Sequence, residues 1–159
     1  MISRDRVCEL VSYDPATGVF TRLKSRAQWI GRPAGKTDSQ GAIQILLDGQ
    51  VYLAHRLAWL VMTGSWPETE IDHKDRNPSN NAWGNLRLAT RSQNMQNIGH
   101  ARGRTGFKGI CRERWKKDFR WRVSVSKEKA RHVAHFKCFG QAVKHAAKMR
   151  RELHGDFAA

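Results

Sequence analysis

The 159-residue sequence has few cysteines and no long apolar segment. Its three cysteines are scattered and none forms a CxxC pair, which argues against a disulfide framework or a zinc knuckle. No run of about 18 apolar residues occurs, so we expect no membrane span. The N-terminus MISRDRVCELV carries charges where an export signal needs apolar residues. The sequence therefore predicts reduced thiols and a cytoplasmic protein that makes no use of a membrane.

Acidic residues are also scarce, with 14 Asp and Glu against 29 Lys and Arg, a net charge of +15. The imbalance is uneven along the chain. Residues 1–97 have 12 Lys and Arg and 9 acids, whereas residues 98–159 have 17 and 5. Strongly basic proteins usually meet nucleic acid or an anionic membrane surface. We therefore expect phosphate affinity mainly in the C-terminal third, with a merely solubilising cationic surface as the alternative.

Hydrophobic patterning predicts an α+β chain in two parts. In the first part we expect a helix near the N-terminus with Ser3 as its cap, a short strand over residues 19–23, and a loop over residues 24–40. A hairpin with a type I′ turn at Asp48-Gly49 and a buried helix ending at Gly64 follow. After a basic linker at 98–106, the second part should contain three short strands and a helix ending at Gly155. The expected spans are residues 107–114, 119–125, 131–139 and 140–155.

The segment IDHKDRNPSNNAWGNLRLATRSQNMQN, residues 71–97, is rich in asparagine. Asparagine suits turns, caps and oxygen-donor ligation rather than helix or sheet interiors. In front of it stands Asp72-His73. An imidazole is a natural general base near neutral pH, and a carboxylate can hold a hard cation such as Mg²⁺. The segment therefore predicts a structured loop beside a candidate general base and a candidate metal ligand.

The downstream half of this segment predicts a strand followed by a helix. NLRLAT alternates, with Leu86 and Leu88 expected to face inward. Thr90 and Gln93 have the spacing of a capping box, which starts a helix that carries Asn94. An acid and an amide from separate elements would form an open, oxygen-rich metal site.

The stretch DHKDRNPSNNAWGNLRLATRSQNMQN resembles the ββα-metal finger of HNH endonucleases of the phage and homing type. The preceding VYLAHRLAWLVMTGSWPETEI is similar to the same branch, so the resemblance covers roughly residues 34–97. It implies an HNH nuclease domain at 1–97, with the His-Me finger at 69–97. In such a finger His73 is the general base, Asp72 and Asn94 ligate one divalent metal, and Asn85 fixes the loop and so orients His73.

The third signature position is often histidine in this family, and here it is Asn94, as in part of the homing branch. An amide oxygen favours Mg²⁺ or Mn²⁺ over zinc. Several neighbours of the motif have more than one interpretation. His55 either supports the site from behind His73 or is a satisfied core or capping residue. The turn-forming interpretation is preferred for Asn77, Asn80 and Asn81, and packing is preferred for Trp59, Trp66 and Trp83.

The segment FRWRVSV in the basic part alternates sharply. Its apolar face, Phe119, Trp121, Val123 and Val125, should pack on the C-terminal helix, which leaves the face of Arg120, Arg122 and Ser124 free. A narrow sheet that bears arginines fits the major groove of DNA. A solvated edge protected by charge is the alternative. We expect four further basic residues of the first strand and its turn to extend the arginine face: Lys108, Arg112, Arg114 and Lys116.

Residues 107–159 resemble the Apetala/ethylene-response-factor DNA-binding domain, a three-stranded antiparallel sheet on one helix. GFKGICRERWKKDFRWRV is similar to its opening strands, and FGQAVKHAAKMRRELHGDFA to its helix and tail. Trp115 falls near a position where that family places a DNA-contacting tryptophan. The resemblance implies that double-stranded DNA is the partner of this part of the chain.

Together these patterns predict a metal-dependent, site-specific DNA endonuclease of the homing or phage HNH type. It would yield a 3′-hydroxyl and a 5′-phosphate, as a monomer or a homodimer. The alternative is a non-catalytic, sequence-specific DNA-binding regulator with a relic nuclease fold. A nuclease that cuts RNA by the same chemistry is a third possibility.

Overall fold

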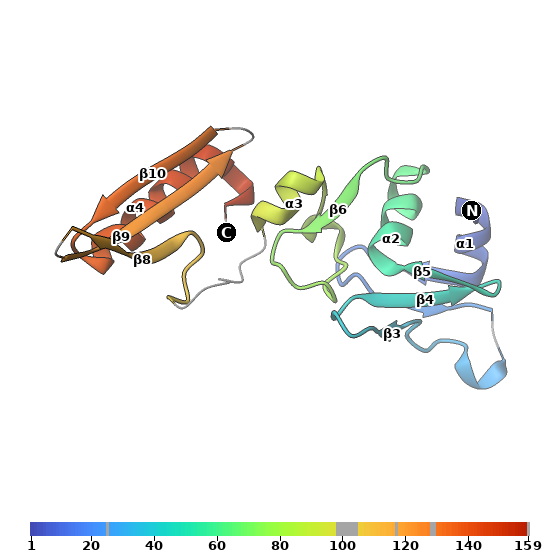
Figure 1. The fold of residues 1–159 in the computed structure, drawn as a ribbon. Helices are drawn as coiled ribbons and strands as arrows, with labels where there is room; N and C mark the ends of the chain where they lie inside the picture. The colour runs from blue at the N-terminus through green and yellow to red at the C-terminus, as the bar shows by residue number, and fades with distance from the viewer. Residues whose placement is uncertain (25, 98–104, 117, 128–129, 159) are drawn as a thin grey trace. The chain divides into compact units, whose positions relative to one another are not determined.

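The computed structural model describes residues 1–24, 26–97, 105–116, 118–127 and 130–158. The chain forms two compact units, residues 1–90 and 91–159 (Figure 1). This division falls before the boundary expected at residue 97, because the helix α3 (Arg91–Asn97) groups with the C-terminal unit. Most of the expected linker, residues 98–104, lies outside the described residues. No helix of the described chain is both long and apolar enough to cross a membrane.

The first unit mixes short helices with three small antiparallel sheets. The sheets pair β1 with β2, order three strands as β3-β4-β5, and pair β6 with β7. The elements are α1 (Arg4–Leu10), β1 (Val11–Tyr13), β2 (Phe20–Arg22), η1 (Ala27–Trp29), β3 (Lys36–Thr37), β4 (Ile43–Leu47), β5 (Gln50–Leu53), α2 (Ala54–Thr63), β6 (Glu70–His73), η2 (Trp83–Asn85) and β7 (Leu86–Ala89).

Local signals placed most of these elements correctly. The Ser3 side chain accepts a hydrogen bond from the Arg6 amide and caps α1. Asp48 and Gly49 have φ values of 47° and 79°, the left-handed conformations that a type I′ hairpin turn requires. Gly64 ends α2 in the left-handed region. The segment 24–40 is not wholly a loop, because it contains η1 and β3.

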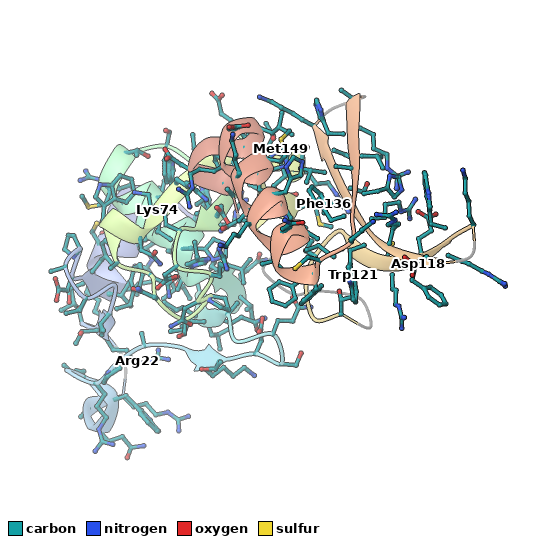
Figure 2. All side chains as sticks on the ribbon, turned by 90° about the vertical axis from the view of Figure 1, so that its left-hand side faces the viewer. Arg22, Lys74, Asp118, Trp121, Phe136 and Met149 are labelled. Carbon is teal, nitrogen blue, oxygen red and sulfur yellow. The ribbon has the colours of Figure 1, made fainter. Side chains whose placement is uncertain are left out.

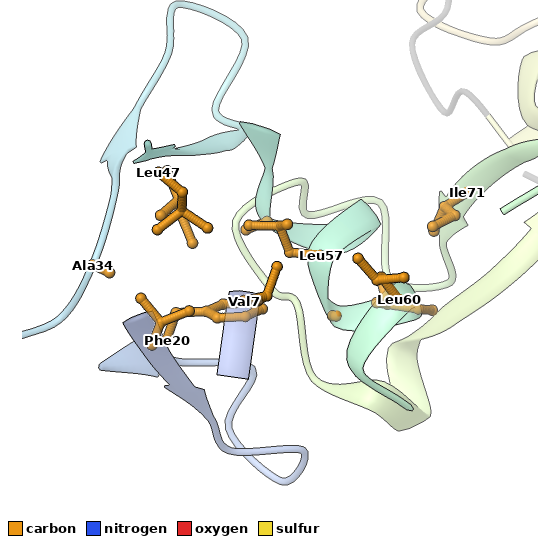
Figure 3. Packing of buried hydrophobic residues seen from close by; sticks show 12 residues of the cluster. Val7, Phe20, Ala34, Leu47, Leu57, Leu60 and Ile71 are labelled. Carbon is orange, nitrogen blue, oxygen red and sulfur yellow. The ribbon is translucent and has the colours of Figure 1, made fainter. Parts of the chain in front are cut away.

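The core of the first unit forms where α1 and α2 pack against the strands (Figure 3). Val7, Phe20, Leu57, Ile71 and Leu86 all lie in this cluster. The expectation that Leu88 also faces inward is wrong, because its side chain is 42% exposed. Alternation predicts the face that a side chain takes, but not whether another element covers that face.

The β1–β2 turn holds the loop that follows β6. Tyr13 donates a hydrogen bond from its hydroxyl to the Asn81 carbonyl at 2.8 Å, and the Trp83 amide donates to the Pro15 carbonyl at 2.9 Å. Gly18 lies so close that an added Cβ would stand 2.2 Å from the Ala82 nitrogen. The N-terminal hairpin therefore fixes the backbone of this loop by direct contact.

The second unit is a three-stranded antiparallel sheet with a helix on one face, as the sequence predicts (Figure 1). The strand order is β10-β9-β8. Val123 and Val125 of β9 pack against Ala142 and Ala146 of α4. The elements are α3, β8 (Ile110–Trp115), β9 (Asp118–Lys127), β10 (Ala130–Phe136), α4 (Phe139–His154) and η3 (Gly155–Phe157).

The contact at Gly18 predicts a large loss of stability for Gly18→Ala. The methyl group would collide with backbone, and φ of +75° strains any L side chain. Gly49→Ala is the matched control, since its φ is +79° but nothing lies within 4 Å of the added Cβ. We expect the control to cost about 1–2 kcal/mol from strain alone and Gly18→Ala to cost more. Thermal unfolding that gives equal losses for both variants would contradict this contact.

Candidate functional site

The side chains of Asp72 and His73 lie on opposite faces of β6. Asp72 is opposite Arg87 on β7, and His73 is opposite Leu86. Directly opposite residues in an antiparallel pair share a face. Asp72 therefore shares a face with Arg87, whereas His73 lies on the same side as the core residue Leu86.

Asp72 forms a buried ion pair with Arg87. The Nε atom of Arg87 donates to Oδ2 of Asp72 at 2.8 Å, and its second guanidinium nitrogen lies 2.7 Å from the same oxygen. The exposed fractions of the two side chains are 5% and 14%. A buried carboxylate needs such a partner, because the unpaired charge would be costly to desolvate. The pair holds the carboxylate in one orientation through Oδ2.

His73 contacts two polar neighbours. Its Nε2 lies 3.4 Å from Oδ1 of Asn81, whose amide nitrogen donates to the Ser79 carbonyl. Because the Asn81 oxygen can only accept, this contact is a hydrogen bond when Nε2 carries the proton. In that tautomer the lone pair of the ring is on Nδ1. Asn81 itself is 1% exposed, so the contact is well fixed.

The second neighbour of His73 is His55, at the start of α2. The two rings are perpendicular, with centroids 5.2 Å apart. Burial is the main cause that lowers the pKa of His55 to about 4, and electrostatic repulsion from His73 and Arg56 acts in the same direction. Its buried Nδ1 has no hydrogen-bond partner in the part of the chain that the structure describes. His55 is therefore a neutral group packed against His73, and its role in supporting the site stays a prediction.

A network around Asp75 fixes the loop between β6 and β7. Asn85 accepts from the Asp75 amide at 3.0 Å, and its Nδ2 donates to the Asp75 carboxylate and to the Asn80 carbonyl. Burial raises the pKa of Asp75, but hydrogen bonds from Asn77, Asn80 and Asn85 together lower it below its ordinary value. The charged carboxylate is thus part of the loop structure, and the loop should weaken as the pH falls through that lowered pKa.

The residues predicted to bind metal fall in different units. Asp72 lies on β6 in the first unit, and Asn94 lies on α3 in the second. Their joint ligation of an ion therefore stays a prediction. The described residues contain no group of three or more His, Cys, Asp or Glu side chains that could hold a metal ion. One carboxylate and one amide fit a hard cation that keeps water and phosphate as its other ligands.

The surroundings of Asp72 and His73 are more closed than the sequence suggested. The two residues are 4% and 8% exposed. The openness expected of the metal site also depends on Asn94 in the second unit and stays a prediction. Sequence patterns did not predict that Arg87 would pair with the carboxylate or that Asn81 would contact the imidazole, whereas a position of His55 behind His73 was one of the two interpretations considered.

The arginine face of the second unit is the other predicted site. Arg120 and Arg122 lie on the sheet face away from α4, as expected, and Trp115 shares that face beside His135. The expectation that Arg112 and Arg114 extend this face is wrong. They lie opposite Trp121 and Phe119, the apolar face of β9, because neighbours on a strand alternate.

Two more of the predicted DNA contacts lie at the ends of β8. Lys108 precedes the strand and donates hydrogen bonds to the carbonyls of Met95 and Gln96 at the end of α3. Lys116 follows the strand in a turn, with φ of 50°. Any role of either in binding DNA stays a prediction.

Sequence reasoning missed Arg131 on β10. The register places it on the arginine face, and its Nε donates to Oγ of Ser124 at 2.8 Å. Glu113 is an acid on this face, and it pairs with Arg122 and His135. Among the described residues no carboxylate pairs with Arg120 or Arg131. Only the register of β10 against β9 reveals this, because RHVAHF alternates too weakly to assign its faces.

Comparison with known proteins finds a family model over the part of the chain that contains β6. Residues 52–96 match the family model described as HNH endonuclease, which spans α2, β6, β7 and most of α3. The chain is 36% identical to "Protein 3.8" of Escherichia phage T7 over 107 residues, which is 65% of this chain and 86% of the phage protein. No solved structure matches. The chain therefore belongs to the family of phage T7 protein 3.8 and contains an HNH endonuclease domain at residues 52–96.

Proposed function

We propose that the protein is a metal-dependent DNA endonuclease in which His73 is the general base. The observation that carries the proposal is the fixed geometry of the β6–β7 loop. Asn85 holds Asp75, and Asn81 holds Nε2 of His73, so that Nδ1 is the basic nitrogen. A general base needs this kind of orientation before it needs a tuned pKa.

In this mechanism Nδ1 of His73 takes a proton from a water molecule. The water oxygen attacks the scissile phosphorus, and the bond from phosphorus to the 3′ oxygen breaks. The 3′ oxygen leaves and is protonated from solvent, which gives a 3′-hydroxyl and a 5′-phosphate. Asn81 and His55 keep the imidazole in place during the transfer.

Asp72 and Asn94 are the residues that would hold a divalent metal, Mg²⁺ or Mn²⁺. The two contacts of Arg87 with Oδ2 of Asp72 hold the carboxylate in one orientation. When bound, such an ion stabilises negative charge on the phosphoryl and leaving oxygens. In this proposal the role of Arg87 is to orient the carboxylate that would ligate the ion.

Double-stranded DNA is held in this proposal by the arginine face of the second unit. Arg120 and Arg131 lack carboxylate partners in the described chain, and a flat face with arginines suits a major groove. We propose a homing or phage role for the enzyme, and sequence-specific contacts through this face.

A second candidate is a non-catalytic DNA-binding protein with a relic nuclease fold. The observation that favours it is burial: Asp72 is paired with Arg87, and His73 is only 8% exposed. Catalysis by His73 requires that Nδ1 becomes accessible to the attacking water when DNA is bound. The two functions differ in whether removal of His73 changes cleavage.

Replacement of His73 by alanine should abolish cleavage and leave DNA binding intact. The general base contributes roughly 10²–10⁴-fold to the rate, so plasmid nicking in Mg²⁺ should fall at least a hundredfold. His132→Ala is the matched control, because His132 is exposed on β10 and should have no effect. If His73→Ala cuts as fast as the wild type, or if EDTA leaves wild-type cleavage unchanged, the mechanism is wrong.

Asn85→Ala should lower the cleavage rate without weakening DNA binding. It removes the hydrogen bonds that hold the loop, at a cost of about 2 kcal/mol in unfolding free energy. Asn77→Ala is the control from the same loop, since the Asn77 side chain accepts hydrogen bonds from Ser79. Single-turnover rates and melting curves measure both effects. Equal cleavage by the two variants would show that Asn85 does not position the base.

Loss of Arg120 and Arg131 should weaken DNA binding more than loss of Arg112 and Arg114. Both double changes to glutamine remove two charges from the sheet, the first from β9 and β10 and the second from β8, but only the first pair lies on the face away from α4. The slope of log affinity against log salt should fall by about 1.8 for the first pair. Equal slopes for the two double variants would show that DNA binding does not depend on which face of the sheet carries the arginines.

A further inference from the structure

The loop between β2 and β3 exposes apolar and basic side chains together. Leu23, Trp29 and Ile30 are 46%, 46% and 52% exposed. Residues 22–36 contain five Lys and Arg and no acid. Burial of large apolar side chains is favourable, so several exposed ones in a single loop indicate a surface that binds another molecule. We refer to Leu23, Arg26, Trp29, Ile30 and Arg32 as the basic loop.

The backbone around the basic loop is fixed by hydrogen bonds. The Arg22 amide donates to the Arg32 carbonyl at 3.0 Å, and the Gly31 amide donates back to the Arg22 carbonyl at 2.9 Å. Within the loop, the Trp29 amide donates to the Arg26 carbonyl, and the Arg32 amide donates to the Trp29 carbonyl. The segment that follows Arg22 projects from the body of the first unit, with its side chains pointing outward (Figure 2). These apolar groups are thus presented on a defined turn.

The arginines of the basic loop have no acidic partner among the residues that the structure describes. Across the described parts of the chain, no carboxylate pairs with Arg26, Arg32 or Lys36. Lys24 does pair with Glu9, at 3.6 Å. The Arg32 guanidinium lies 5.7 Å from the Trp29 ring centre, which keeps a cation beside the aromatic surface. A nucleic acid would fit this surface, because its phosphates can pair with the arginines and its bases can contact the exposed apolar side chains.

We propose that the basic loop binds duplex DNA through the minor groove, with Arg26 and Arg32 on phosphates and Trp29 and Ile30 against the base edges. Minor-groove proteins combine arginine and lysine with apolar wedges that partly unstack a base step. This surface is a second DNA contact, on the unit that contains His73. It rests on the proposed function in that it takes DNA to be the substrate.

Duplex DNA fits this loop better than a protein or a membrane. A protein partner would normally meet a mixture of charges at the rim, whereas residues 15–37 contain no acid at all. A basic loop with a tryptophan also suits an anionic lipid surface. The HNH domain on the same chain favours DNA, since the loop then contacts the molecule that the domain acts on. Binding to lipid vesicles or to a protein is an outcome that the test can reveal.

The test measures binding of the full chain to a fluorescent DNA duplex in EDTA, where the proposed cleavage cannot occur. The variants are Trp29→Ala with Ile30→Ala, and Arg26→Gln with Arg32→Gln. The apolar control is Leu46→Ala with Val51→Ala, a pair of strand residues that are 55% and 58% exposed. The charge control is a glutamine double variant of two exposed lysines on α4, Lys144 and Lys148.

The arginine variant should bind about tenfold more weakly, with a salt slope lower by about 1.8. The apolar variant should bind several-fold more weakly with an unchanged salt slope, because it removes no charge. A duplex containing 2-aminopurine should brighten when the wild type binds and stay dark with the apolar variant, since unstacking raises its fluorescence. Both controls should bind within about twofold of the wild type. All positions are exposed, so melting curves should show that every variant folds.

Affinity and salt slope equal to the wild type in both loop variants would overturn the proposal. So would an equal loss in the lysine control, which would indicate a mere effect of net charge. Wild-type binding to phosphatidylserine vesicles that the loop variants lose, with DNA binding unchanged, would assign the loop to a membrane instead. These outcomes are independent of cleavage. His73→Ala should bind DNA normally without cutting it, so failure of the proposed catalysis would be seen separately.

Discussion

The site depends on the hydrogen bonds between Asn85 and Asp75. These bonds close the loop between two strands that are only four residues long, β6 and β7. A two-stranded hairpin is marginal alone, so the position of His73 at the end of β6 is only as fixed as this loop. The N-terminal hairpin adds a second constraint through Tyr13, whose hydroxyl holds the Asn81 carbonyl. Two segments far apart in the sequence thus constrain the loop that follows His73.

At this site, charge is neutralised by ion pairing or removed by a lowered pKa, and it is not solvated by water. Arg87 neutralises the buried Asp72, and burial keeps His55 uncharged beside His73. The charges beside the groups that would act on a phosphodiester are therefore largely neutralised. In a region of low dielectric, a single added cation or phosphate would have a strong effect. In the proposed mechanism, bound metal and DNA would supply such charges.

The sequence predicted features that depend on neighbours in the chain. The turn at Asp48-Gly49, the end of α2 at Gly64 and the alternation of β9 follow from local rules and are confirmed. It did not predict features set by register between distant strands. One must know which residues lie opposite one another to predict the Asp72–Arg87 pair, the face of Arg112 and the presence of Arg131 on the arginine face. Whether Leu88 and the basic loop are exposed likewise depends on which elements pack against them.

The division into two units has a consequence for catalysis. A tether raises the local concentration of DNA near a nuclease unit, but it does not orient a phosphodiester. Cleavage requires the scissile phosphorus within about 3–3.5 Å of the attacking water, with the bond in line. Such precision comes from contacts on the body that holds His73. If the arginine face supplies affinity, then a contact like the basic loop is needed on the first unit to set the angle at which the backbone meets the imidazole.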